Sequence, residues 1–301
     1  MNVTFRQLKV FEAVARHLSY TLAAKELYLT QPAVSMQIKQ LEENAGLPLL
    51  EQIGKKIYLT EAGHEMYHYA RSIARELDEA ASIIEQLKGV ESGKLEITVA
   101  TTANAFATKM LAKFKTNHTG VTISLDVTNR ERLLEQLNNN DKDIAIMGRP
   151  PKSEGLIAES FAENPLVIVA SPDHPLAGKK NIPLNQLQDE IFVVREQGSG
   201  TRTAMQRFFD KHNMEITSSM EMNENEAIKQ AVQAGMGLGI VSIHTLELEL
   251  VTDRLVIVDV EEFPIMRHWY LVHLKDKRLP PIAQAFKEFV LSEGRNLIPH
   301  L

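Results

Sequence analysis

The sequence predicts a multidomain chain with three successive parts: short helices with a β hairpin, then one long helix, then a two-lobed α/β region. Three patterns support this prediction. Apolar residues recur at helical spacing through the first 60 residues, they follow a heptad spacing over residues 61–90, and from Gly93 onward short apolar strands alternate with helical segments. We therefore expect domains at residues 1–60 and 93–301, joined by a linker helix over residues 61–90.

The composition sets the outer limits of this prediction. Of the 301 residues, 44% are hydrophobic and 24% are charged, which suits a water-soluble chain with two or three cores. The sequence contains no cysteine, which excludes disulfide bonds, thiol catalysis and cysteine-ligated zinc. Charged residues interrupt the first 14 positions, where a secretory signal needs an apolar core, so we expect a cytoplasmic protein with no membrane partner.

The charge is distributed unevenly along the chain. The whole sequence has 33 basic and 39 acidic residues, a net charge of -6. The first 60 residues contain seven basic and five acidic residues, which leaves 26 basic and 34 acidic residues for the remainder. A mildly basic N-terminal domain on an acidic body permits local contact with phosphates while the body repels nucleic acid. An excess of two positive charges is compatible with nucleic-acid binding, but it is too small to show that the protein binds nucleic acid.

The first two helices are predicted from apolar spacing and from capping residues. A helix over residues 4–16, capped by Thr4, follows from apolar side chains that recur every three or four positions, namely Phe5, Leu8, Phe11 and Ala15. A second helix over residues 22–27 has Thr21 as its expected cap, and its two adjacent alanines allow close approach to a neighbouring helix.

The third helix carries most of the residues that we expect to contact DNA. It should begin after Thr30, with Pro32 in its first turn, and end at Gly46. One side is apolar, whereas the other carries glutamines that can bind adenine edges, a serine that can bond a phosphate or a base, and apolar groups that can contact a thymine methyl. The candidate DNA-binding residues on this helix are Thr30, Gln31, Pro32, Ala33, Ser35, Met36, Gln37 and Lys39.

Three short helices with a tight turn between the last two are typical of a helix-turn-helix, whose last helix lies in the major groove. The segment LLEQIGKKIYLTEAG then predicts a β hairpin with Gly54, Lys55 and Lys56 at its tip. A lysine tip can rest on the phosphate backbone or enter a minor groove. A helical bundle with a solvated, glutamine-rich face and a solvated hairpin fit the same patterns, so both alternatives stay open at this point.

LysR-type transcriptional regulators have a winged helix-turn-helix that this sequence resembles almost position for position, over FRQLKVFEAVARHLSYTLAAKELYLTQPAVSMQIKQLEENAGLPLLEQ and LTEAG. The resemblance implies a sequence-specific regulator that binds double-stranded promoter DNA and is not an enzyme. It also implies that the polar face of the third helix enters the groove and that Lys55 and Lys56 meet the minor groove or phosphates. Many family members have arginine where Met36 stands, so we expect one charged contact to be missing and the base preference to differ.

The segment EAGHEMYHYAR contains the pattern H-E-x-x-H, formed by His64, Glu65 and His68. Histidines four residues apart on a helix can both bind zinc while the glutamate activates a water molecule. The same segment begins a helix capped by Thr60, along which heptad spacing predicts pairing with a second copy through Met66, Ala70, Ile73, Leu77, Ala80, Ile84 and Leu87. A zinc hydrolase also needs a third ligand and a substrate groove, so we interpret the histidines as solvated and expect no metal site.

The remaining sequence predicts two α/β units. The first comprises strands over 94–100, 121–128 and 143–148 with helices over 104–116 and 130–137. The second comprises strands over 166–171, 191–196, 219–223, 239–243 and 255–260 with helices over 201–212 and 224–234. A strand over 268–274 and a helix over 282–291 should return to the first unit, giving lobe I (93–162 and 267–301) and lobe II (163–266). Two lobes joined by crossovers form a hinged clamp like the periplasmic binding proteins, the fold of LysR-type effector domains.

Ligands of such sheets bind beyond the carboxyl ends of the strands, where this sequence is rich in polar residues. The glycine-rich turn in VREQGSGTR opens a helix, so its N–H groups, the helix dipole and Arg202 together favour an anion, although an ordinary strand-to-helix turn fits as well. We expect a small anionic metabolite and no cofactor. The candidate effector-binding residues are Thr101, Thr102, Asn104, Thr128, Asn129, Gly148, Arg149, Gly198, Ser199, Gly200, Thr201 and Arg202.

The segments TTAN, IMGRPP, REQGSGTR and NEAIKQAVQAGMGLGIVS resemble the LysR-type subgroup that controls carbon-dioxide-fixation (Calvin-cycle, RuBisCO) operons. This resemblance implies effectors such as phosphorylated sugars, phosphoglycolate-like acids or a nicotinamide nucleotide. We expect a homodimer formed through the heptad seam of the linker helix, and the family resemblance implies that it assembles into a homotetramer. RNA polymerase is an expected further partner. The rival classes, a secreted solute-binding module and a zinc hydrolase, would need a signal sequence or a metal cluster, and the sequence supplies neither.

Overall fold

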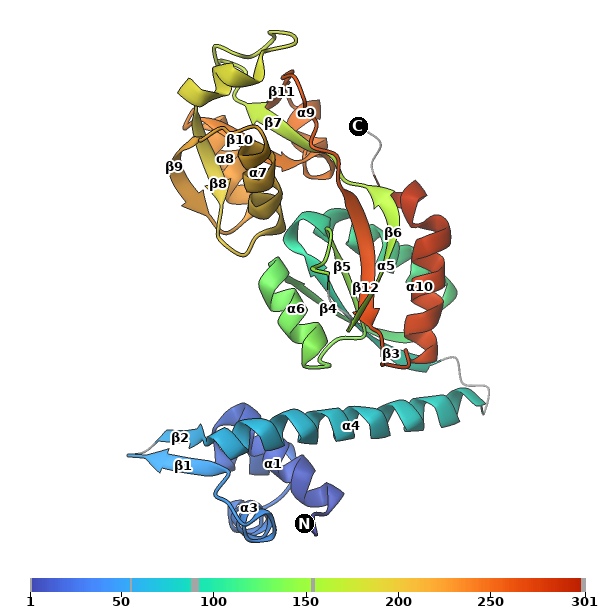
Figure 1. Ribbon diagram of the computed structural model, residues 1–301. Coiled ribbons are helices and arrows are strands. Elements are labelled where there is room, and N and C mark those ends of the chain that lie inside the picture. Colours follow the sequence, from blue (N-terminus) through green and yellow to red (C-terminus); the bar gives the residue numbers. More distant parts are fainter. Residues whose placement is uncertain (1, 55, 88–91, 153–154, 299–301) are drawn as a thin grey trace. The chain divides into compact units, whose positions relative to one another are not determined.

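The computed structural model describes residues 2–54, 56–87, 92–152 and 155–298 (Figure 1). The chain divides into two compact units, Met1–Gly89 and Val90–Leu301. Each unit has its own hydrophobic core. In the part of the chain that is described, no helix has the length and apolar content needed to span a bilayer.

The first unit contains three short helices, a hairpin and one long helix. Its elements are α1 (Phe5–His17), α2 (Tyr20–Glu26), α3 (Gln31–Ala45), β1 (Leu50–Ile53), β2 (Lys56–Leu59) and α4 (Glu61–Leu87), with β1 and β2 antiparallel. The prediction for the second helix was wrong at its start. The helix begins at Tyr20, and its cap is Ser19, whose Oγ accepts a hydrogen bond from the N–H of Leu22 at 3.3 Å. Thr21 instead lies exposed within the first turn.

Helix α3 has the caps and the apolar face that the sequence predicts. The Thr30 Oγ1 accepts a hydrogen bond from the N–H of Ala33, and Gly46 ends the helix in the left-handed region at φ 75°. Its apolar stripe is buried in the core of the unit and is formed by Val34, Ile38 and Leu41. Burial of this stripe fixes which side of α3 faces solvent.

Helix α4 is anchored to the hairpin through a close backbone contact. The Thr60 Oγ1 accepts a hydrogen bond from the N–H of Gly63 at 3.0 Å, as the predicted cap requires. A Cβ atom at Gly63 would lie 1.9 Å from the carbonyl oxygen of Leu49, so only glycine fits here. Ala70 is buried against the core of the unit, whereas Ile73, Leu77 and Ile84 are 42%, 51% and 54% exposed. Most of the heptad seam of α4 is therefore uncovered in the single chain.

The second unit contains two five-stranded mixed sheets. Lobe I has the order β4-β3-β5-β12-β6, with β3 parallel to β4 and β5, and β12 antiparallel to β5 and β6. Its elements are β3 (Ser92–Ala100), β4 (Gly120–Thr128), β5 (Ile144–Met147), β6 (Leu156–Glu163), β12 (His268–Leu274), α5 (Asn104–Asn117), α6 (Arg130–Asn138) and α10 (Pro281–Glu293), with short 3-10 helices η1 (Thr101–Ala103) and η4 (Gly294–Leu297). The last strand and helix thus return to lobe I, as the sequence predicts. Strand β6 was not predicted; it is a half-exposed edge strand and lacks a continuous apolar run.

Lobe II has the strand order β11-β7-β10-β8-β9, in which β8, β9 and β10 are parallel and β7 runs antiparallel to β10 and β11. Its elements are β7 (Leu166–Ala170), β8 (Ile191–Arg195), β9 (Thr217–Met222), β10 (Leu238–Ser242), β11 (Val256–Val258), α7 (Gly200–Lys211), α8 (Asn225–Gln233) and α9 (Glu247–Val251), with η2 (Leu184–Asp189) and η3 (Ile243–Thr245). Its apolar residues pack on both faces of the sheet.

Two chain segments connect the lobes and are hydrogen-bonded to each other. The N–H of Asn164 donates to the carbonyl of Arg267 at 2.7 Å, and Leu166 and Ile265 exchange two backbone hydrogen bonds at 3.0 Å. Figure 1 shows both segments running between the two sheets. Paired crossing segments of this kind form a hinge that holds the lobes at a defined separation while allowing them to rotate.

Candidate DNA-binding face and interlobe cavity

The solvent side of α3 presents a row of polar and small side chains. Gln31, Pro32, Ser35, Met36 and Lys39 are exposed, and Ala33 and Gln37 are partly exposed. Met36 is 55% exposed although it is apolar. Because the opposite stripe is buried, these side chains are held outward by a helix that cannot rotate. They have the positions that groove readout by a recognition helix requires.

The other predicted DNA contacts differ in how they are placed. Thr30 is exposed, but its hydroxyl serves as the cap of α3. Lys39 lies 3.9 Å from Glu43, a long and solvent-exposed ion pair that leaves its ammonium accessible. Lys56 is exposed at the start of β2, and Lys55 lies outside the described residues.

The H-E-x-x-H histidines lie on the exposed side of α4. His64, Glu65 and His68 are all exposed near the start of the helix. Among the residues that the structure describes, no group of three or more His, Asp or Glu side chains is arranged to hold a metal ion. Within the described ranges, no third side chain joins His64 and His68 to make the ligand set of a zinc hydrolase.

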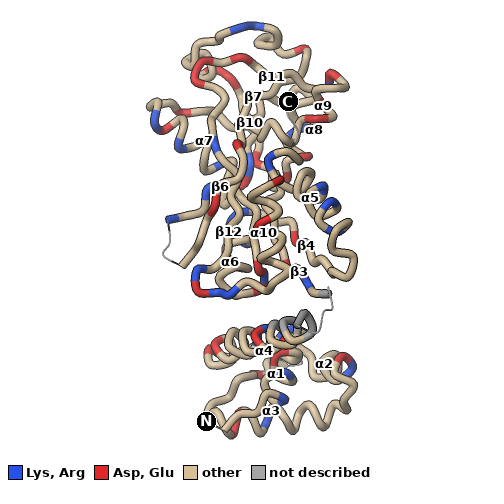
Figure 2. Tube along the Cα trace, turned by 90° about the vertical axis from the view of Figure 1, so that its right-hand side faces the viewer, with Lys and Arg blue, Asp and Glu red and all other residues tan. Residues whose placement is uncertain are grey.

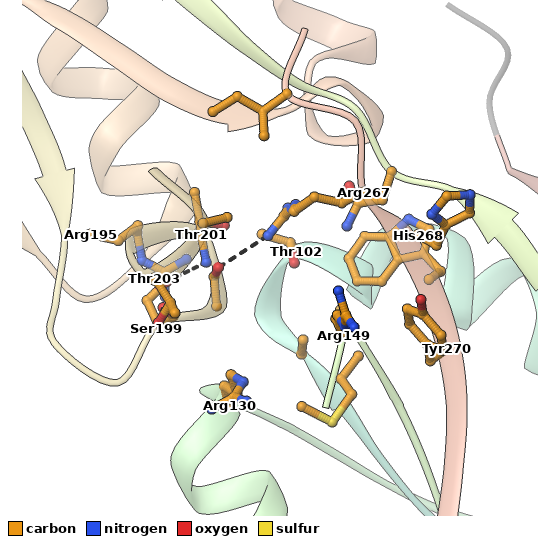
Figure 3. Close-up of a pocket in the computed structure, with 18 of the residues that line it drawn as sticks. Thr102, Arg130, Arg149, Arg195, Ser199, Thr201, Thr203, Arg267, His268 and Tyr270 are labelled. Atoms are coloured by element: carbon orange, nitrogen blue, oxygen red, sulfur yellow. Dashed lines mark hydrogen bonds between the residues drawn. The ribbon is translucent and has the colours of Figure 1, made fainter. Parts of the chain in front are cut away.

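A cavity of about 540 Å³ lies between the lobes of the second unit (Figure 3). Six basic side chains line it, and no carboxylate does so among the described residues: Arg130, Arg149, Arg195, Arg207, Lys211 and Arg267. Lys and Arg, drawn blue in Figure 2, occur on both α6 and α7. A cleft lined by charges of one sign concentrates ligands of the opposite sign, so the cavity is suited to an anion.

Nine of the twelve predicted effector-binding residues line this cavity. They come from the carboxyl ends of β3, β4 and β5 and from the start of α7, as expected for an α/β sheet. The nine residues are Thr101, Thr102, Thr128, Asn129, Gly148, Arg149, Ser199, Gly200 and Thr201.

The other three predicted residues point elsewhere. Asn104 comes after the η1 turn, and its backbone and side-chain oxygens accept hydrogen bonds from Thr108. Gly198, at φ 86°, faces α6, since a Cβ there would lie 2.9 Å from the Glu131 carboxylate. Arg202 lies two residues before the lining residue Ala204, and at about 100° per residue this places it on the opposite side of α7. The expectation that these three residues face the ligand cavity is therefore corrected.

The sequence did not indicate several lining residues. They are Arg130, Asn164, Arg195, Thr203, Arg207, Lys211, Arg267, His268 and Tyr270. Strand β12 runs antiparallel to β5, with Tyr270 opposite Met147, so the start of β12 lies at the sheet edge where β5 ends. This antiparallel pairing, which the predicted parallel unit did not include, explains why residues from the beginning of a strand enter the site. The positions on α7 repeat at helical spacing from Gly200, a signal that could have found them.

Arg195 organises one wall of the cavity without being free to bind a ligand. Arg195 is 3% exposed, and its side chain forms two hydrogen bonds with the Glu196 carboxylate, at 2.7 and 3.0 Å. It also donates to the Asn225 Oδ1 at 2.8 Å and to the Thr101 Oγ1 at 3.4 Å. The last contact joins lobe II to lobe I. Because Glu196 already neutralises this guanidinium, we interpret Arg195 as a residue that holds the wall of the cavity in place and does not bind the ligand.

Arg267 and Asn164 present unsatisfied donors at the hinge. Arg267 donates from Nη1 to the carbonyl of Gly200 at 3.1 Å, but its Nε is buried without a partner among the described residues. Burial lowers the pKa of Arg267 to about 10, which still leaves it charged at neutral pH. Asn164 is 0% exposed; its Oδ1 accepts from the Ser242 hydroxyl at 2.7 Å, while its Nδ2 has no partner there. A buried donor left unpaired costs about 1–3 kcal/mol, so an acceptor atom bound here is stabilising.

The start of α7 contributes less to the site than its glycine-rich sequence indicates. The Ser199 Oγ accepts hydrogen bonds from the N–H groups of Thr201 and Arg202, at 3.2 and 3.5 Å. The helix therefore caps two of its own free N–H groups. Figure 3 shows Arg267 extending toward this first turn, where Ser199 and Thr201 lie. The charged side chains, more than the helix end, make this cavity attractive to an anion.

Two family models match the chain. "Bacterial regulatory helix-turn-helix protein, lysR family" matches residues 5–64, and "LysR substrate binding domain" matches residues 88–295. The RuBisCO operon transcriptional regulator of Allochromatium vinosum is 55% identical, over 99% of this chain and 98% of that protein. The HTH-type transcriptional activator CmpR of Synechocystis sp. is 43% identical, over 97% of this chain and 96% of that protein.

Solved structures show the same architecture. The regulatory domain of Synechocystis PCC6803 CcmR in complex with 2-PG is 42% identical, has a TM-score of 0.66, and covers 68% of this chain and 99% of that one. Full-length CbnR complexed with its target DNA has a TM-score of 0.70 at 22% identity, covering 96% of this chain and 99% of that one. The second match supports the fold alone.

Proposed function

Because the chain belongs to the LysR family of bacterial transcriptional regulators, we propose that it controls carbon-dioxide-fixation genes in response to a small anionic metabolite bound between its two lobes. The chain is a DNA-binding regulator and not an enzyme, as are the relatives that match it over almost its whole length. The carbon-fixation target is supported by the names of several of these relatives, including RuBisCO operon regulators.

The observation that carries the anion proposal is the interlobe cavity itself. It has six basic side chains and, among the described residues, no lining carboxylate. Two buried donors at the hinge, Arg267 Nε and Asn164 Nδ2, lack acceptors. The similarity to a regulatory domain in complex with 2-PG supports a ligand of this size and charge. We take phosphoglycolate-like acids, phosphorylated sugars and a nicotinamide nucleotide as the effector classes to test.

The DNA-binding part of the proposal rests on α3 and the hairpin. The groove contacts are assigned to the exposed face of α3, and Lys55 and Lys56 are assigned to the phosphates or the minor groove. Base reading by glutamine and serine side chains supplies specificity, whereas the lysines supply affinity that depends on salt.

The assembly part of the proposal rests on the uncovered seam of α4. Ile73, Leu77 and Ile84 follow the heptad spacing and are about half exposed in the single chain. A second copy that covers this seam would form a homodimer, and two dimers would form a homotetramer in the cytoplasm. RNA polymerase is the expected further partner at the promoter. An effector changes DNA binding only if its affinity differs between two arrangements of the assembly.

The experiment uses the full-length protein and promoter DNA from carbon-fixation genes of its source genome. DNA binding is measured by fluorescence anisotropy and footprinting, and ligand binding by calorimetry with 2-phosphoglycolate, ribulose 1,5-bisphosphate and NADPH. Ser35→Ala should weaken DNA binding about tenfold and leave ligand binding unchanged, because it removes a contact of α3 only. Arg267→Gln should show the reverse pattern.

Arg132→Gln is the matched control, since Arg132 is an exposed cation on α6 that does not line the cavity. It should change neither measurement. Loss of DNA binding in Arg267→Gln but not in Ser35→Ala would contradict the division of labour between the two units. Absence of binding to every one of the three anions would contradict the proposed effector class.

A further inference from the structure

Tyr28, in the turn between α2 and α3, combines an exposed side chain with a strained backbone. The residue is 96% exposed, so its phenol ring lies almost entirely in solvent. Its φ of 55° is in the left-handed region, which a bulky side chain rarely adopts. A single exposed aromatic residue is ordinary on a protein surface. One that also strains the backbone is expected to have a function that offsets this cost.

The end of α2 explains why the backbone takes this conformation. The N–H of Leu29 donates to the carbonyl of Ala24 at 2.9 Å. The N–H of Tyr28 donates to the carbonyl of Lys25 at 3.4 Å. These two bonds form the Schellman motif that ends a helix, and the left-handed position within it favours glycine. Leu27 and Leu29, on either side of Tyr28, pack against the core of the unit and fix the turn.

Tyr28 is next to the proposed DNA-binding face. Thr30, the cap of α3, follows it by two residues, and Gln31 and Pro32 in the first turn of α3 are exposed. In a helix-turn-helix, the start of the recognition helix contacts bases while the preceding helix crosses the sugar-phosphate backbone. The turn that joins these helices therefore lies at the edge of the groove, where a long side chain can reach a phosphate.

The charges near this turn are compatible with a phosphate. Lys25 is exposed in the last turn of α2, one helical turn before Tyr28. The carboxylate of the adjacent Glu26 is held by Arg16 and His17, both at 2.6 Å. A phosphate at the turn would thus meet an exposed cation and a phenol hydroxyl, which can donate a hydrogen bond.

We propose that Tyr28 is a further DNA contact, whose phenol hydroxyl donates a hydrogen bond to a phosphate oxygen at the edge of the groove that α3 enters. This inference rests on the DNA-binding part of the proposed function and adds a contact outside α3 and the hairpin. A hydrogen bond to a charged acceptor is about twice as strong as one between neutral groups, so this contact offsets the backbone strain. Because the contact is to the DNA backbone, it carries no base preference.

The test compares two substitutions of Tyr28 in the full-length protein. Tyr28→Phe removes only the hydroxyl, whereas Tyr28→Gly removes the whole side chain together with the strain. Fluorescence anisotropy measures affinity for a carbon-fixation promoter duplex and for a scrambled duplex of the same length and composition. Both variants should bind both duplexes about tenfold more weakly, because a hydrogen bond to a charged group is lost and a phosphate contact does not depend on sequence.

Urea denaturation followed by circular dichroism separates this loss from unfolding. Tyr28→Gly should be at least as stable as the wild-type protein, since glycine adopts a φ of 55° without a steric cost. A structural role for the tyrosine would instead lower stability together with affinity. Ethylation interference should also lose, in Tyr28→Phe, the phosphate position that the wild-type hydroxyl contacts.

Leu18→Gly is the matched control for the backbone. Leu18 has φ 47° at the end of α1 and is 45% exposed, but its side chain has no donor for a phosphate. Tyr69→Phe is the control for the hydroxyl, since Tyr69 is 59% exposed on α4, outside the proposed DNA-binding face. Both control variants should keep the wild-type affinity for DNA.

Wild-type affinity in Tyr28→Phe on both duplexes would overturn the hydroxyl contact, even if Tyr28→Gly binds more weakly. Weaker binding to the promoter duplex alone would overturn the assignment to a phosphate, because it would indicate base reading. Failure of the proposed carbon-fixation target would appear differently, as equal wild-type affinity for the two duplexes. The Tyr28 variants would then still be compared with the wild-type protein on the scrambled duplex.

Discussion

The two functional surfaces of this chain are built in different ways. The proposed DNA-binding face of the first unit lies almost entirely on one helix, α3, over nine consecutive positions from Gln31 to Lys39. The interlobe cavity of the second unit takes its side chains from segments spread between Ala100 and Tyr270. A surface on one helix needs only that the helix forms and buries its apolar stripe, whereas a cavity between lobes needs the topology of both sheets.

This difference decides what a substitution can do. In the first unit, a surface residue can be changed without disturbing the fold, because the core lies on the other side of α3. In the cavity, Arg195 and Arg267 both bind backbone or side chains of neighbouring segments, so the site and the local fold share the same residues. Substitutions in the first unit and in the cavity should therefore differ in how far they disturb the fold.

The largest effect is expected from Gly63→Ala. This substitution tests whether the stability of the first unit, like its binding face, depends on structure within that unit alone. The added Cβ would lie 1.9 Å from the Leu49 carbonyl oxygen, so α4 and the hairpin would have to separate. We expect the first unit to lose about 3 kcal/mol of stability or more, and DNA binding with it. Fluorescence of Trp269, the single tryptophan of the chain, should show unchanged unfolding of the second unit.

Gly46→Ala is the control in the same unit. Gly46 has φ 75°, but a Cβ there would meet no atom within 4 Å. The cost is then the backbone strain alone, about 1 kcal/mol. Equal destabilisation by the two substitutions, measured by urea denaturation followed by circular dichroism, would show that the close contact of Gly63 with Leu49 is not essential.

Arg267→Gln should have the next largest effect, and it tests the role of a cavity residue in ligand binding. The substitution removes the buried guanidinium of Arg267, whose Nε has no partner in the described structure. Because this donor is left for a ligand, the substitution should weaken ligand binding. We expect the affinity for 2-phosphoglycolate to fall about 100-fold, in line with about 2–3 kcal/mol for a charged hydrogen-bond partner. Calorimetry measures this, and an unchanged affinity would show that the anion binds elsewhere in the cleft.

The two units also differ in how much of each could be predicted from the sequence. Heptad and helical spacing predicted the elements of the first unit, apart from the start of α2, since caps and buried stripes are local features. In the second unit, nine of the twelve residues that were chosen for their places after strand ends line the interlobe cavity. Arg202 was misplaced because the glycine-rich turn indicated a helix start but not which side of α7 faces inward. Arg267 was missed because its position depends on the antiparallel pairing of β12 with β5, a contact between distant segments.

Met36→Arg is expected to have a moderate effect and tests how independently the α3 face can be changed. Met36 is 55% exposed, so a longer charged side chain fits without altering the core. The added cation should raise DNA affinity about tenfold at low salt and steepen the dependence of log affinity on log salt concentration by about one. Anisotropy titrations at several salt concentrations measure both quantities. An unchanged salt dependence would show that this position does not approach the phosphates or bases.

The smallest effect is expected from Glu26→Gln, which examines electrostatics within the first unit. Hydrogen bonds from Arg16 and His17, both at 2.6 Å, lower the pKa of Glu26 from 4.5 to about 2. A carboxylate whose pKa is lower in the folded state stabilises that state above pH 4.5, and this contribution disappears as the pH falls toward 2. Because Glu26 is 41% exposed, solvent screening keeps it below about 1 kcal/mol.

The wild-type and Glu26→Gln proteins should therefore differ slightly in stability at pH 7 and converge as the pH falls from about 4.5 to 2. Hydrogen exchange of α1 and α2 peptides, corrected for intrinsic rates, measures this difference. Glu43→Gln is the control, since its ion pair with Lys39 is 3.9 Å long and exposed and should contribute nothing measurable. A difference that persists well below pH 2, where the Glu26 carboxyl group is protonated, would mean that Glu26 stabilises the helices through packing and that its hydrogen bonds with Arg16 and His17 have no electrostatic effect on stability.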